Sequence, residues 1–143
     1  MERILISFAM FFLTLGCSDK NDDQFQEEDF LGTWTLIEQR EYGGTPNTDW
    51  RPVVNGYQIE LKADGTFVTD KFSPECTEGE YSISITDNTL TFSFGCPGFS
   101  VEGLSDDNVF IEKYSFEGVY LILSPTYLSC DEGCAFKFSP VEG

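Results

Sequence analysis

The chain has 143 residues, a formal net charge of −17 and no histidine, while 41% of its residues are hydrophobic and 15% aromatic. This acidity argues against nucleic acid and anionic lipid surfaces as partners, because contacts with phosphate depend on lysine and arginine. The absence of histidine removes the usual general base and the commonest zinc ligand, and the apolar content is typical of a folded domain rather than a disordered chain.

Residues 1–16 have the features of a secretory signal peptide: a charged start, an uncharged run over 4–15 and a small residue at the end. The apolar run is too short for a membrane span, which takes about 20 residues. Cys17 follows directly, and residues 13–17 (Leu-Thr-Leu-Gly-Cys) resemble the lipobox of bacterial lipoproteins. The resemblance implies cleavage before Cys17, a diacylglyceryl group on its thiol and an anchor in the bacterial outer membrane.

Residues 17–29 are polar and acidic, which predicts a flexible tether between the lipid and the domain. The stretch over 18–23 is similar to the acidic tract that directs some Gram-negative lipoproteins to the cell surface. The cell surface and the periplasmic face of the outer membrane both remain open. Residues 30–143 form the expected domain, which is long enough for one hydrophobic core.

Beyond Phe30 the pattern is one of strands and turns, without a helical period in any long window. The candidate strands are 31–41, 56–62, 66–72, 80–86, 89–95, 99–104, 108–115, 119–124 and 135–139. Turn signals between them recur every 8–12 residues or so, which predicts an all-β barrel or sandwich. We expect the segment 99–104, which contains Gly103, to be a broken strand.

One predicted hairpin turns at residues 87–88 and sets Tyr81 opposite Phe94. In this register the large apolar side chains share one face and the serines and threonines share the other, so a slip by one residue is excluded. Continuing the ladder brings Cys76 near Cys96, and we expect a disulfide to clamp the open end of this hairpin.

A second predicted hairpin turns at residues 63–65. A three-residue loop with Gly65 in the left-handed region pairs Leu61 with Phe67. A two-residue loop would instead set Phe67 opposite Lys62, on the wrong face of the strand.

Four cysteines remain besides Cys17, an even number that suits an oxidising compartment. We expect the pairs Cys76–Cys96 and Cys130–Cys134, with cross-pairing between the two groups left open. The spacings do not match those of zinc ribbons, so no metal site is predicted.

The start of the domain, Gly32-Thr33-Trp34, together with the strand–Asp-Gly–Thr-Phe hairpin over 59–67, resembles the lipocalin-like lipoproteins of bacteria. The resemblance implies a small antiparallel up-and-down β-barrel of about eight strands, here without a C-terminal helix. It places Trp34 across the closed end of the barrel and implies that Gly32 allows a close approach of neighbouring groups there. Lipocalins commonly cover this tryptophan with an arginine of the last strand, where the present chain offers only Lys137.

Catalysis is not predicted, since a Ser-His-Asp arrangement is impossible and the paired acids 27–28 and 106–107 lie in polar segments. No cofactor is expected. Tyr42 and Trp50 belong to a long loop at the mouth of the expected barrel and are candidate ligand contacts. Two hypotheses follow: a binding protein for a small apolar ligand, or a closed-core module that works through protein contacts at its surface.

Overall fold

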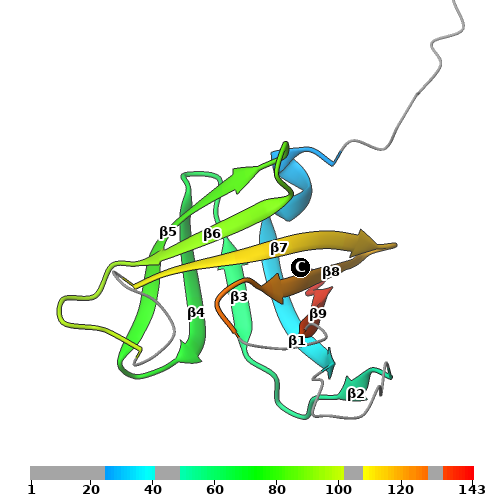
Figure 1. Ribbon diagram of the computed structural model, residues 1–143, viewed down its shortest axis with the longest axis horizontal. Helices are drawn as coiled ribbons and strands as arrows, with labels where there is room; N and C mark the ends of the chain where they lie inside the picture. Colours follow the sequence, from blue (N-terminus) through cyan, green and yellow to red (C-terminus); the bar gives the residue numbers. More distant parts are fainter. Residues whose placement is uncertain (1–24, 41–48, 102–107, 129–133) are drawn as a thin grey trace, which may run out of the picture.

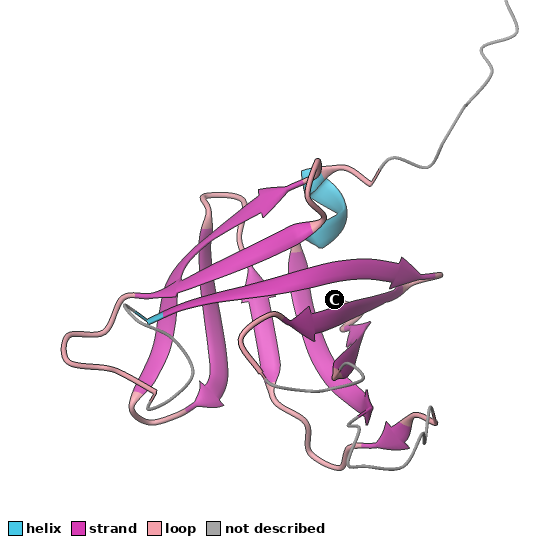
Figure 2. Ribbon diagram, viewed as in Figure 1, coloured by secondary structure: helices cyan, strands magenta, loops and turns pink. Residues whose placement is uncertain are grey.

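The computed structural model describes residues 25–40, 49–101, 108–128 and 134–143. This part of the chain contains one short helix and nine strands. They are η1(Glu27–Phe30), β1(Gly32–Arg40), β2(Arg51–Pro52), β3(Gln58–Leu61), β4(Thr66–Phe72), β5(Cys76–Ser84), β6(Thr89–Phe94), β7(Val109–Glu117), β8(Tyr120–Pro125) and β9(Ala135–Pro140). Strands account for nearly all of the regular structure (Figure 2).

The strands form a closed antiparallel barrel of the predicted lipocalin-like, up-and-down class. From β3 to β9 each strand pairs with the next one along the chain, and pairing of β1 with both β3 and β9 closes the ring at eight strands. The two-residue β2 pairs with the far end of β1. Residues 99–101 are not a strand, as expected for the broken segment, and residues 102–104 lie outside the described part.

The barrel has two ends with different coverings. One, here called the helix end, carries η1 and the β3–β4, β5–β6 and β7–β8 turns. The opposite one, the disulfide end, carries the β4–β5 turn and the connection that leaves β6. In Figure 1 the blue η1 lies beside the β5–β6 turn, with the β4–β5 turn at the far end of the same strands.

The helix end is closed by aromatic side chains, as the position of Trp34 predicts. Trp34 is 5% exposed, and its indole N–H donates to the carbonyl oxygen of Phe30 over 2.8 Å. The ring of Phe30 is fully buried and packs edge-on against Tyr114 and Phe116. Trp34 is therefore covered by η1 and not by a cation of the last strand.

Two predictions at the helix end need correction. The expected tether reaches to residue 29, yet Phe25 stacks on Phe116 at 4.2 Å and η1 begins at Glu27, so the ordered domain starts earlier. Gly32 does not serve a close approach, because a Cβ there would meet no atom within 4 Å. Its φ of +118° is the reason for glycine, since other residues are strained at that angle.

The β3–β4 hairpin has the predicted register. Leu61 pairs with Phe67 across a three-residue turn, and Gly65 has the expected left-handed φ of +83°. Asp64 secures the turn by accepting hydrogen bonds from the backbone N–H and hydroxyl of Thr66.

The β5–β6 hairpin differs from the prediction by two residues. Tyr81 pairs with Phe92 rather than Phe94, and the turn spans residues 85–88. A slip by two residues leaves every side chain on its own face, so the apolar pattern could not detect it. The hydroxyl of Ser84 and the carboxylate of Asp87 bond at 2.8 Å and close the longer turn.

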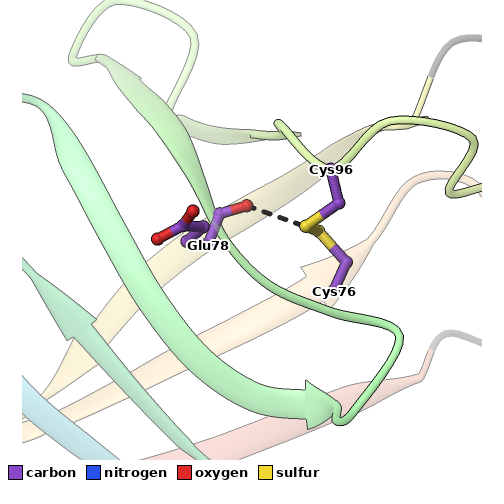
Figure 3. Close-up of a disulfide and its surroundings, with 3 residues drawn as sticks. All are labelled: Cys76, Glu78 and Cys96. Carbon is purple, nitrogen blue, oxygen red and sulfur yellow. Dashed lines mark hydrogen bonds between the residues drawn. A yellow bond between two sulfur atoms is a disulfide. The ribbon is translucent and has the colours of Figure 1, made fainter.

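The Cys76–Cys96 disulfide is present and clamps the open end of this hairpin, as predicted (Figure 3). The corrected register favours it, since Gly79 pairs with Phe94 and the extended ladder brings Cys96 beside the neighbour of Cys76. The sulfur of Cys76 lies 3.5 Å from the carbonyl oxygen of Glu78, a contact without a donated proton because a disulfide sulfur carries no hydrogen. Cys134 is disulfide-bonded too, and its predicted partner Cys130 lies outside the described residues.

Aromatic rings fill the barrel. Phe67, Phe110 and Phe138 are almost fully buried, and Phe67 meets Phe92 and Phe94 edge-on at 5.0 Å. Tyr120, in contrast, is exposed.

Within the described residues there is no helix of the length and apolar character that crossing a membrane requires.

Candidate functional site

Four polar side chains gather inside the barrel toward its disulfide end. Lys71 lies near the end of β4, Glu112 lies on β7, and Tyr57 and Tyr127 flank β3 and β8. We call these four residues the interior polar cluster. The alternation of β7, in which Phe110, Glu112 and Tyr114 are buried, places Glu112 on an inward position between two aromatic rings.

Hydrogen bonds link three members of the cluster. The hydroxyl of Tyr127 donates to Glu112 Oε1 over 2.5 Å, and Lys71 Nζ donates to the Tyr127 oxygen over a long 3.5 Å. Glu112 is only 4% exposed, and its second oxygen, Oε2, is buried without a hydrogen-bond partner among the described residues. An unpaired buried carboxylate oxygen is costly, so it marks a place for a hydrogen-bond donor.

Burial shifts the proton affinities of the whole cluster. It raises the pKa of the Glu112 carboxyl, against the opposing effects of the Tyr127 hydrogen bond and the Lys71 charge. It lowers the pKa of the Lys71 ammonium, against the attraction of Glu112. Burial and the charge of Glu112 raise the pKa of both Tyr57 and Tyr127, so both phenols keep their protons at neutral pH.

A small cavity adjoins the cluster. Its volume is about 20 Å³ over the positions open to the centre of a water-sized sphere, which is room for about one water molecule. The lining residues are Tyr57, Ile59, Phe67, Thr69, Lys71, Phe92, Phe94, Phe110, Glu112 and Leu123. The cavity thus combines aromatic walls with one ammonium and one carboxylate.

Glu112→Gln is expected to change how stability depends on pH. Because the folded-state pKa is raised, the folded protein keeps a proton that the unfolded chain loses near pH 4.3. The wild type should therefore lose stability, relative to the variant, as the pH rises from about 4.3 through the folded-state pKa. Urea unfolding at a series of pH values measures this difference. A difference that stays constant or grows in favour of the wild type contradicts the burial of an ionisable Glu112.

The candidate ligand contact Trp50 lies elsewhere. Its ring stacks under two cations, with Lys137 Nζ at 4.2 Å and Arg40 Cζ at 4.8 Å from the ring centre. Lys137 alternates with the core residues Phe136 and Phe138, so it points to the outer face of the barrel. Trp50 therefore covers the outside of the barrel and does not line the cavity.

Of the other residues named from the sequence, the structure describes Lys137 but not Tyr42 or Cys17. Lys137 pairs with Glu38 at 3.0 Å and with Trp50, so it does not cover Trp34. Tyr42 and the lipidation site Cys17 lie outside the described residues.

The interior polar cluster was not predicted, although the sequence places polar residues at inward positions of two strands. Glu112 interrupts a run of inward aromatic positions on β7, a strand predicted over 108–115 and observed at Val109–Glu117. Lys71 likewise follows the buried Phe67 and Thr69 on alternate positions of β4.

In comparisons with known proteins, no protein-family model matches the chain, and no curated protein matches it either. Among the described residues no group of three acidic, cysteine or histidine side chains could hold a metal ion. The interior polar cluster can supply hydrogen bonds and charged groups beside an aromatic cavity.

Proposed function

We propose that this chain is a lipid-anchored lipoprotein of the bacterial outer membrane whose lipocalin-like barrel binds a small molecule at its disulfide end. The observation that carries the binding role is the unpaired Oε2 of the buried Glu112, which borders the interior cavity. A lipocalin-like relationship agrees with the closed eight-stranded barrel and with the tryptophan of the first strand buried under η1.

A barrel that served only as a closed core would not need such a group. Burying a carboxylate and an ammonium costs free energy, and apolar residues of similar volume would pack there at least as well. Ionisable groups whose pKa values are shifted by burial and by a charged neighbour in a cavity are candidates for a functional site. The interior polar cluster therefore favours a ligand with polar atoms over the purely apolar ligand expected from the aromatic composition.

The closed-core module remains the second candidate because of the size of the cavity. A volume of about 20 Å³ admits about one water, so any larger ligand must displace a side chain on entry. Native mass spectrometry of the protein extracted from its own membranes separates the two candidates. A retained small molecule that is lost in Glu112→Leu supports the binding role. A bare polypeptide plus its lipid anchor, in repeated preparations, supports the closed core.

Lipid attachment is tested by Cys17→Ser. A lipoprotein carries two or three acyl chains, and two are enough for a stable membrane anchor. The variant should be recovered as an uncut precursor or in the wrong compartment, as seen by fractionation and intact mass. Its control is Ser18→Ala, which keeps the cysteine and should be processed normally. Normal processing and membrane recovery of the Cys17 variant would exclude the anchor.

A further inference from the structure

The cavity at the disulfide end is lined by Glu112, and one oxygen of this carboxylate lacks a hydrogen-bond donor among the described residues. Glu112 Oε1 is satisfied by the Tyr127 hydroxyl, whereas Oε2 has no partner in the described part of the chain. The group that completes this site must supply an N–H or O–H at a buried, negatively polarised position. An ammonium supplies it best, because hydrogen bonds between ions of opposite charge are shorter and stronger than neutral ones.

The aromatic walls also select a cation. Lys71 Nζ lies 5.3 Å from the ring centre of Phe72, 5.5 Å from that of Tyr57 and 5.9 Å from that of Phe110. Ring faces attract cations at such distances, and three of them around one ammonium form an aromatic cage. In the structure this cage holds the protein's own lysine, so the walls already accommodate an ammonium on an alkyl chain.

Lys71 is placed so that it can leave the cage. It is the last residue but one of β4, and the β4–β5 turn that follows is exposed at the disulfide end. Its hydrogen bond to Tyr127 is long, and burial disfavours its charged form. Turning outward would hydrate the ammonium and free the volume of its butyl chain beside the existing cavity.

We propose that this cage binds the ammonium group of a small primary alkyl amine, and that Lys71 occupies it when no ligand is bound. The inference rests on the proposed binding function and names its ligand class. An anion would face the Glu112 carboxylate, and an apolar molecule would leave Oε2 unpaired. The net charge of −17 adds a field that draws cations to the protein.

Calorimetric titration with n-propylammonium tests the proposal, because this ion reproduces the lysine side chain beyond Cβ. We expect saturable binding to the wild type and binding about tenfold tighter or more to Lys71→Ala, whose cage is vacant. Adding Glu112→Gln to Lys71→Ala should weaken binding about tenfold. The matched control is Lys113→Ala, which removes an exposed lysine next to Glu112 and should bind as the wild type does.

A measurement on the wild type keeps the test independent of how the variants fold. Ring currents should shift the NMR signals of the Lys71 side chain away from those of exposed lysines, and n-propylammonium should return them to ordinary positions. Lys71 signals that stay unchanged at saturating amine overturn the proposal. So does wild-type protein without saturable binding, Lys71→Ala that binds no better than Lys113→Ala, or equal binding of the neutral analogue 1-propanol.

The outcomes also separate this inference from the proposed function. A retained natural molecule without a basic nitrogen would uphold small-molecule binding and overturn the amine assignment. Amine binding in vitro, with no molecule retained by protein from its own membranes, would uphold the site and count against the proposed binding role.

Discussion

Replacing Trp34 by alanine is expected to lower the free energy of unfolding by about 3–5 kcal/mol, as for other buried aromatic residues. The indole is 5% exposed at the helix end and packs near Phe116, with 6.2 Å between ring centres. The truncation would leave a cavity beneath η1 and remove the hydrogen bond that holds the Phe30 carbonyl oxygen. Urea unfolding followed by circular dichroism measures the change.

Two further variants divide the effect into its parts. Trp34→Phe keeps an aromatic ring but loses the indole N–H. Loss of this hydrogen bond should lower the free energy of unfolding of the variant by about 1 kcal/mol. Trp50→Ala removes a tryptophan of the outer face and should cost much less than Trp34→Ala. Equal losses for the two alanine variants would mean that Trp34 does not close the barrel.

Removing the Cys76–Cys96 disulfide is expected to cost about 3 kcal/mol. The bond joins residues 20 apart in sequence, and its main effect is to restrict the unfolded chain. It also holds the start of β5 against the chain that leaves β6, at the same end of the barrel as the interior polar cluster. The double variant Cys76→Ala/Cys96→Ala avoids a free thiol, and chemical denaturation against the wild type gives the difference.

The single variant Cys96→Ala serves as the control for packing. It breaks the same bond but keeps the Cys76 side chain, which is 1% exposed. If the cross-link carries the effect, the single and double variants should be about equally unstable. A single variant as stable as the wild type would assign the loss to the packing of Cys76 instead.

Local chemistry accounts for the features that were predictable. The β3–β4 register follows from the turn at residues 63–65, where Asp64 and Gly65 are neighbours in sequence and act within a few residues. The all-β class follows from alternation and turn spacing, which are properties of single strands. The pairing of Cys76 with Cys96 was also within reach, because both belong to one hairpin.

The β5–β6 register marks the limit of such reasoning. Alternation specifies which face a side chain takes, and shifts of zero and two residues satisfy it equally. In the observed register the hydroxyl of Ser84 donates to Asp87 across the turn, and β6 pairs with β7 on its other edge. Neither contact can be recognised from the pattern of apolar residues in the sequence.

The sequence by itself determined the strand faces and the β3–β4 turn, since each depends on residues close together along the chain. The burial of Trp34 at the closed end was expected only from the family resemblance, because its packing partner Phe116 is distant in sequence. Only the tertiary structure decided the interior polar cluster, because Tyr57, Lys71, Glu112 and Tyr127 come from separate parts of the chain. Closure of β1 on β9 likewise brought Lys137 to Trp50 on the outer face and away from Trp34. Charge and burial of these groups depend on neighbours that meet only when the barrel closes.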